Sequence, residues 1–127
     1  MRIALDTNRY IDFCKGVPDV VDRLRRVEWI GLPLVVLAEL RAGFLCGSRT
    51  AANERNLIAF LDSPRVEVLY PDDATTHHYA RLYRQLRDQG TPIPTNDLWI
   101  ASLVLEYDLQ LFARNAHFDR LPQLARV

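Results

Sequence analysis

The stretch Met1-Arg2-Ile3-Ala4-Leu5-Asp6-Thr7-Asn8 carries the first signal of fold and function in this sequence. Its apolar run over residues 3–5 predicts a short buried strand, and Asp6 stands where that strand ends. Open α/β sheets bind their ligands just beyond the carboxyl ends of their strands, so a carboxylate here is well placed for chemistry. The same polar residues are ordinary caps of a following helix, so the stretch alone leaves both interpretations open.

Length and composition predict one globular domain over residues 1–127. With 127 residues and 49% hydrophobic side chains, the chain is long and apolar enough to bury a core. It has no run of about eighteen apolar residues, so no membrane span is expected. The N-terminus leads directly into the first predicted strand without a signal-peptide pattern, so we expect a cytoplasmic protein.

The charged residues and the cysteines exclude some classes of function. The chain has 16 basic and 16 acidic residues, and this balance argues against binding nucleic acid by bulk electrostatics. Cys14 and Cys46 lie far apart, and no Cys/His zinc spacing accompanies them. We expect both cysteines to be small buried hydrophobic residues.

Strand and helix patterns alternate along the chain, which predicts a parallel sheet with helices on both faces. The expected strands are residues 2–5, 29–32, 66–69 and 109–113. The expected helices are residues 9–15, 18–27, 33–45, about 50–61, about 73–89 and about 96–107, followed by one helical turn and a short strand within 115–127.

Two of these helices predict how the core is covered. The segment Leu34-Val35-Val36-Leu37-Ala38 is apolar almost all round, which implies that its helix is buried. In the helix of residues 73–89, helical spacing predicts a buried stripe made of Tyr79, Leu82, Tyr83 and Leu86.

Glu39 is the most informative polar residue, because it interrupts an apolar helix. Glutamate is almost never fully buried unless it is paired. Glu39 therefore either points to a rim or meets a cation. A salt bridge to an arginine such as Arg41 or Arg114 is an equally good explanation from the sequence alone.

Further polar residues occupy the starts of helices and the ends of strands. Asp97 lies in the first turn of a helix, where the helix dipole favours a negative charge without any function, but apolar residues follow it immediately. Asn115 follows the last strand as Asp6 follows the first, so parallel strands would bring both to one sheet edge. Asp119 is close enough to support or replace Asn115. His117 is near enough to touch a substrate phosphate, although nothing in the pattern supports a role as a base.

Carboxylates that converge on one edge without a basic partner repel each other, and a divalent cation relieves that repulsion. Oxygen-only ligands select hard ions, namely Mg²⁺ or Mn²⁺. Such an ion can activate water and neutralise a phosphate oxygen, which is the basis of metal-dependent phosphodiester hydrolysis.

At this point the sequence resembles a known family, the PIN domain, and most closely the VapC-like toxins of bacterial type II toxin–antitoxin pairs. Each motif is weak alone, but together they follow the family's order and span essentially the whole chain. The matching segments are Asp6-Thr7-Asn8, Leu37-Ala38-Glu39-Leu40-Arg41-Ala42-Gly43, Asn96-Asp97-Leu98-Trp99-Ile100-Ala101 and Leu111-Phe112-Ala113-Arg114-Asn115-Ala116-His117-Phe118.

The resemblance implies a Mg²⁺- or Mn²⁺-dependent endoribonuclease on a three-layer α/β sandwich with a mostly parallel central sheet. Asp6, Glu39 and Asp97 match the family's acidic triad and imply its metal ligands, and Thr7 matches a position that helps to order the site. The implied partners are an RNA substrate, a cognate antitoxin and a second copy of the chain. Promoter DNA is implied only through the antitoxin.

The sequence departs from the family pattern at Asn115, where the fourth acidic residue is usually Asp. Asparagine lacks the charge, so Asn115 is expected to act through a water or through its carbonyl oxygen. Asp119 lies beyond the motif's Phe118, so Asn115 and Asp119 both stay candidates for the fourth site residue, and one or two metal ions both stay open. No side chain is obviously tuned as a nucleophile, which favours direct hydrolysis over a covalent intermediate.

Two other functions fit parts of the sequence. A phosphotransfer enzyme of the haloacid dehalogenase type also begins with a strand-end Asp, but it needs a second Asp where this chain has Asn8. A binding module with an acidic pocket needs no catalysis at all, and the change at Asn115 is consistent with it.

Overall fold

Four parallel strands form the central sheet of the computed structural model, which describes all of residues 1–127. The strands are β1 (Arg2–Leu5), β2 (Trp29–Pro33), β3 (Val66–Leu69) and β4 (Gln110–Phe112), and they lie in the order β3-β2-β1-β4. Every neighbouring pair is parallel, with Leu5 opposite Phe112 where β1 and β4 end. This arrangement confirms the predicted parallel α/β sheet.

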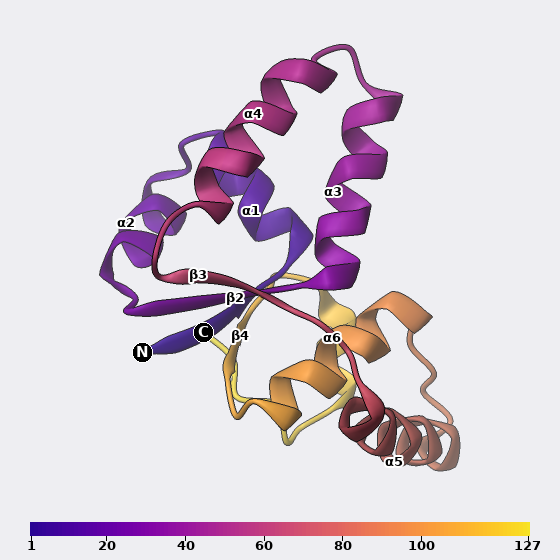
Figure 1. Cartoon of the computed structure of the whole chain (residues 1–127). Coiled ribbons are helices and arrows are strands. Elements are labelled where there is room, and N and C mark those ends of the chain that lie inside the picture. Colours follow the sequence, from indigo (N-terminus) through magenta and orange to yellow (C-terminus); the bar gives the residue numbers. More distant parts are fainter.

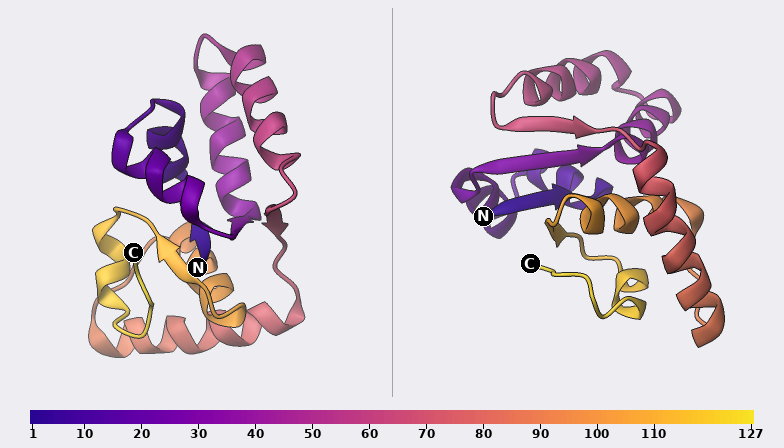
Figure 2. Two further views of the ribbon diagram at one scale, coloured as in Figure 1. Left: turned by 90° about the vertical axis from the view of Figure 1, so that its left-hand side faces the viewer. Right: turned by 60° about the horizontal axis from the view of Figure 1, so that its bottom comes forward.

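Helices cover both faces of the sheet and make three layers (Figure 1). On one side lie α1 (Thr7–Cys14), α2 (Pro18–Arg26), α3 (Leu34–Cys46) and α4 (Thr50–Leu61). On the other side lie α5 (Asp73–Gln89), α6 (Thr95–Glu106) and the short 3₁₀ helix η1 (Ala116–Arg120). The two further views in Figure 2 show the same separation, with both termini close to the sheet. None of these helices has the length and apolar character needed to cross a membrane.

The ends of several elements follow from local chemistry. Asp72 caps α5 and exchanges hydrogen bonds with Thr75, while Gly90 ends the helix in the left-handed conformation that favours glycine. Pro33, expected as the first helical residue, is instead the last residue of β2 and precedes α3. The tail contains the predicted turn as η1, but its expected strand is reduced to one bridge between Leu111 and Arg126.

The prediction that α3 is buried all round is wrong. Val36, Leu37 and Leu40 face the core, whereas Leu34 and Ala38 are exposed. The helix packs on the sheet and on neighbouring helices along one side only, and no other element covers its outer side. The apolar sequence of α3 therefore predicts more burial than the helix has in the single chain.

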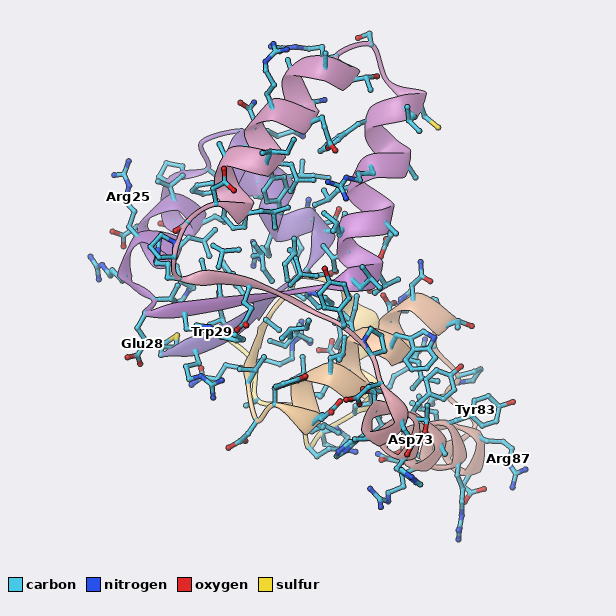
Figure 3. All side chains as sticks on the ribbon, in the orientation of Figure 1. Arg25, Glu28, Trp29, Asp73, Tyr83 and Arg87 are labelled. Carbon is cyan, nitrogen blue, oxygen red and sulfur yellow. The ribbon has the colours of Figure 1, made fainter.

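The predicted stripe of α5 is only partly correct. Leu82 and Leu86 are buried, and Tyr79 packs on Trp99 of α6 with a ring-centroid distance of 4.5 Å. Tyr83 is 57% exposed, and Figure 3 shows its side chain extending away from the helix. Because α5 packs mainly on α6, only a narrow strip of its surface is covered.

Both cysteines are exposed, which corrects the expectation of buried thiols. Cys14 is the last residue of α1 and Cys46 the last residue of α3. Each helix has passed the core by its final turn, so the local apolar pattern no longer implies burial there.

Candidate functional site

The sheet brings the ends of β1 and β4 together. The backbone N–H of Asp6 donates to the carbonyl oxygen of Phe112 at 3.2 Å, so the chain leaving β1 lies directly beside the end of β4. Asp6 and the segment that starts at Ala113 therefore share one sheet edge, as the parallel arrangement predicts.

Asp6 is buried and has no salt-bridge partner. Its side chain is the N-cap of α1, where Oδ1 accepts a hydrogen bond from the Thr7 backbone N–H at 2.8 Å. Burial raises the pKa of Asp6, and the Asp97 carboxylate raises it further. The Thr7 N–H and the positive charges of Arg126 and Arg114 oppose this increase. Asp6 is thus both the cap of α1 and a buried carboxylate without a salt bridge.

Asp97 lies in the first turn of α6 and is 8% exposed. Its Oδ2 accepts a hydrogen bond from Nδ2 of Asn115 at 3.3 Å and lies 2.8 Å from Nδ1 of His117. Both partners come from the segment that follows β4. The Asp97 carboxylate therefore links the start of α6 to the segment that leaves the carboxyl edge of the sheet.

Glu39 reaches the same region from the middle of α3. Burial raises the pKa of Glu39, and the negative charges of Asp6 and Asp97 raise it further. Because Asp6 and Asp97 both act on Glu39, the three acids share one electrostatic environment. The structure thus brings together the three acidic residues that the sequence singles out.

The two arginines named as possible partners of Glu39 pair with other acids. Nε of Arg41 lies 2.8 Å from a Glu54 oxygen, and Nε of Arg114 lies 3.1 Å from Oδ2 of Asp12. Glu39 itself makes no salt bridge. The salt-bridge explanation of this residue is therefore wrong for both named arginines.

The Thr7 hydroxyl supplies a further observation on this site. Thr7 Oγ1 is buried and has no hydrogen-bond partner, although it lies near enough to Glu39 to lower the pKa of that carboxyl group. An unsatisfied buried hydroxyl among carboxylates is costly unless something else binds it. The donor set of oxygen atoms and the missing positive charge both fit a hard divalent cation.

The carboxylates of Asp6, Glu39 and Asp97 do not surround a single metal-binding point in this structure. No group of three or more His, Cys, Asp or Glu side chains is arranged so that it could hold a metal ion. Asp6 and Asp97 are fixed by hydrogen bonds, whereas Glu39 has none that meets ordinary geometry.

The remaining candidates take different positions. Asn115 caps η1, because its Oδ1 accepts the His117 backbone N–H at 2.9 Å while its Nδ2 reaches Asp97. Asp119 is exposed and forms an ion pair with Arg126. The structure therefore brings Asn115 into the acidic cluster and joins Asp119 to a basic side chain.

Two residues near the site gave little signal in the sequence, namely His117 and Asp12. The bond from the His117 ring to Asp97 depends on the tight turn of η1, and the only sequence signal was its place two residues after Asn115. Asp12 is buried and pairs with Arg9 and Arg114, and the only sequence signal was its place between the apolar residues Ile11 and Phe13.

A groove of about 570 Å³ opens beside the acids between α1, α3 and α4. Thr7 and Glu39 of the acidic site line it, together with the polar side chains of Lys15, Arg49, Asn53 and Asn56. Its other lining residues include apolar side chains such as Tyr10, Leu40 and Phe44. The groove thus combines Glu39 and other polar side chains with apolar ones and suits a ligand with both characters.

Known proteins resemble this chain over nearly its full length. The PIN domain family matches residues 3–124. Ribonuclease VapC1 of Haemophilus influenzae (strain R2866) is 34% identical over 98% of this chain and 95% of its own length. Ribonuclease VapC4 of Mycobacterium tuberculosis is 31% identical over 81% of this chain and 78% of its own length.

Solved structures show the same likeness in three dimensions. VapBC2 from Rickettsia felis, bound to a DNA fragment from its promoter, matches all of this chain and 98% of the compared chain at TM-score 0.89 and 29% identity. VapBC-1 from nontypeable Haemophilus influenzae matches all of this chain and 97% of the compared chain at TM-score 0.87 and 30% identity. Sequence motifs, sheet order and full-length similarity agree, and this chain belongs to the PIN domain family, in its group of VapC ribonuclease toxins of VapBC toxin–antitoxin systems.

Proposed function

We propose that this protein is an endoribonuclease toxin that hydrolyses RNA with Mg²⁺ or Mn²⁺ held by Asp6, Glu39 and Asp97. The observation that carries the proposal is a cluster of three acids with no salt bridge to Lys or Arg. Asp6 and Asp97 are buried, and the pKa values of Asp6 and Glu39 are raised partly by their acidic neighbours. Perturbed acids of this kind mark functional sites.

The chain's own residues prepare this site in different ways. The Thr7 backbone N–H holds Asp6, and Asn115 with His117 holds Asp97. The free Thr7 hydroxyl is an additional polar group at the centre. When bound, Mg²⁺ or Mn²⁺ lowers the pKa of a water molecule and neutralises charge on the scissile phosphate. No serine or cysteine lies beside a base in the cluster, which supports direct hydrolysis without a covalent intermediate.

The two alternative functions have less support. A phosphotransfer enzyme of the haloacid dehalogenase type would need an acid at position 8, and Asn8 is an exposed amide on α1. A binding module without catalysis would use the same acidic cluster, so only a measurement of RNA cleavage separates it from the nuclease.

The antitoxin is the proposed occupant of the groove beside the acids. The named relatives from Rickettsia felis and Haemophilus influenzae are VapBC complexes, and the former is bound to promoter DNA. A segment with apolar side chains and one basic residue would match the apolar side chains and Glu39 of the groove. By this proposal, promoter DNA is bound only through the antitoxin, and the toxin acts in the cytoplasm where its RNA substrate is found.

We also propose that the toxin is a homodimer. Exposed apolar side chains remain on the outer side of α3 and on α5, among them Leu34 and Tyr83. Sedimentation analysis of the purified protein tests this point directly, and a strictly monomeric species at micromolar concentration would contradict it.

The decisive test is cleavage of total RNA by the purified protein. We expect fragments with Mn²⁺ or Mg²⁺, loss of cleavage with EDTA, and its return when excess metal ion is added. Trace nuclease contamination is controlled with Asp6→Asn protein purified identically. Full cleavage in EDTA would contradict the metal requirement, and equal cleavage by the Asp6→Asn protein would contradict the assigned site.

A further inference from the structure

The Asp97 carboxylate is held on one of its two oxygens by the segment Asn115–His117. Asn115 Oδ1 accepts the His117 backbone N–H at 2.9 Å, which fixes the orientation of the Asn115 amide. The Nδ2 end of the same amide then donates to Asp97 Oδ2 at 3.3 Å. Both ends of the Asn115 amide are therefore used within the protein.

The His117 ring binds the same oxygen. Its Nδ1 lies 2.8 Å from Asp97 Oδ2, and its side chain is 39% exposed. An ionised carboxylate only accepts hydrogen bonds, so the geometry assigns a proton to Nδ1. Two donors thus meet at Oδ2, while Asp97 Oδ1 has no protein donor.

We propose that His117 and Asn115 are positioning residues that hold Asp97 by Oδ2 and leave Oδ1 as its metal-binding oxygen. The inference rests on the proposed function of the acidic cluster and extends it to residues outside the triad. It also assigns Asn115 a role different from direct or water-mediated metal binding, because its carbonyl oxygen is already used as a cap. Groups that orient a ligating carboxylate commonly change metal affinity 10–100-fold when they are removed.

The change at position 115 also bears on the number of cations. An aspartate there would add a fourth negative charge, whereas Asn115 adds none and donates a hydrogen bond to Asp97 instead. The cluster of three acids therefore matches one divalent cation. Asn115→Asp would replace the donor by a carboxylate oxygen near Asp97 Oδ2, and the resulting repulsion would favour a second cation.

Calorimetric titration with Mn²⁺ alone, in the absence of RNA, tests the role of His117. We expect one Mn²⁺ per wild-type chain and roughly tenfold weaker binding by His117→Ala. His117→Asn should recover most of the affinity, because its amide nitrogen occupies nearly the position of Nδ1. His77→Ala is the matched control, since His77 is an exposed histidine on α5 and should leave the affinity unchanged. Asn115→Asp should raise the stoichiometry to two.

Nitrogen-15 NMR of the metal-free protein tests the geometry independently of any ion. We expect the hydrogen of the His117 ring on Nδ1, bonded to Asp97, and a change in that resonance in Asp97→Asn. An unprotonated Nδ1, or wild-type affinity in His117→Ala when the wild-type protein binds Mn²⁺, would overturn the inference and leave the proposed function intact. Failure of the wild-type protein to bind Mn²⁺ would overturn the proposed metal site and this inference together.

Discussion

Two buried aspartates at either end of α1 have opposite surroundings. Asp12, which is 9% exposed, forms a bidentate ion pair with Arg114 through contacts of 3.1 and 3.3 Å, and a longer contact of 3.4 Å with Arg9. Asp6, which is 5% exposed, has no salt bridge, and its pKa is raised by burial and further by the Asp97 carboxylate. The two aspartates are thus similarly buried, but Asp12 is neutralised by arginines, whereas Asp6 is repelled by a neighbouring carboxylate.

This difference separates a structural charge from a functional one. Asp12 is neutralised by arginines of the same chain, so it needs no ligand to balance its charge. Asp6 lies in a cluster with Glu39 and Asp97 that the chain leaves without a cation, and such local conflicts are tolerated mainly where a ligand resolves them. Arg114 is central to the contrast, because it binds Asp12 instead of Glu39.

The largest expected effect is on catalysis at the unneutralised cluster. Asp97→Asn should lower metal-dependent RNA cleavage by at least about 100-fold, because loss of a charged ligand removes several kcal/mol of stabilisation. Initial rates on a defined RNA substrate with Mn²⁺ measure the effect. Asp88→Asn, an exposed change on α5, is the control and should keep the wild-type rate. A loss below threefold in Asp97→Asn would contradict the assignment.

The next effect is on stability at the neutralised aspartate. Asp12→Asn should destabilise the fold by about 1–2 kcal/mol, because two arginines lose their partner; the partial exposure of Arg114 limits the loss. Urea unfolding measures the free energy directly. An unchanged urea midpoint would show that the ion pairs of Asp12 contribute nothing to stability. Asp12 could then no longer be contrasted with Asp6 as a structural charge.

A smaller effect of opposite sign is expected at Asp6. The folded state raises the pKa of Asp6 above its ordinary value of 3.8, so folding stability falls as the pH rises from 3.8 through the raised pKa. Asp6→Asn removes this loss and keeps a capping side chain, so metal-free Asp6→Asn should unfold a few degrees higher at pH 7. The difference should disappear as the pH falls below 3.8. A thermal series against pH measures it, and a lower unfolding temperature for the variant at pH 7 would contradict the repulsion.

The smallest effect on stability is expected at Thr7. Thr7→Val removes a buried hydroxyl that has no partner, so the free energy of unfolding should change by less than about 1 kcal/mol. Mn²⁺ affinity should nevertheless fall, because the polar group at the cluster is lost, and Thr7→Ser should retain it. Denaturant unfolding and calorimetry separate these outcomes. A large loss of stability with unchanged Mn²⁺ affinity would assign Thr7 a purely structural role.

Sequence patterns were most informative where local chemistry decides the outcome. The run Ile3-Ala4-Leu5, the helix beginning near Asp72 and its end at Gly90 were all predictable from periodicity and capping. Patterns failed where burial depends on what packs against an element. Leu34, Tyr83 and both cysteines are apolar or small residues that no neighbouring element covers.

The sequence by itself determined the alternation of strands and helices, the strand-end position of Asp6 and the anomaly of Glu39, because these depend on neighbours along the chain. Only the tertiary structure decided which arginine neutralises which acid and which donors hold Asp97, because those partners are distant in sequence. Asp12 and Arg114 are 102 residues apart, and Asp97 and His117 are 20 apart. Their pairing depends on the β1–β4 register and on the turn of η1, which are features of the assembled sheet and not of any one local segment.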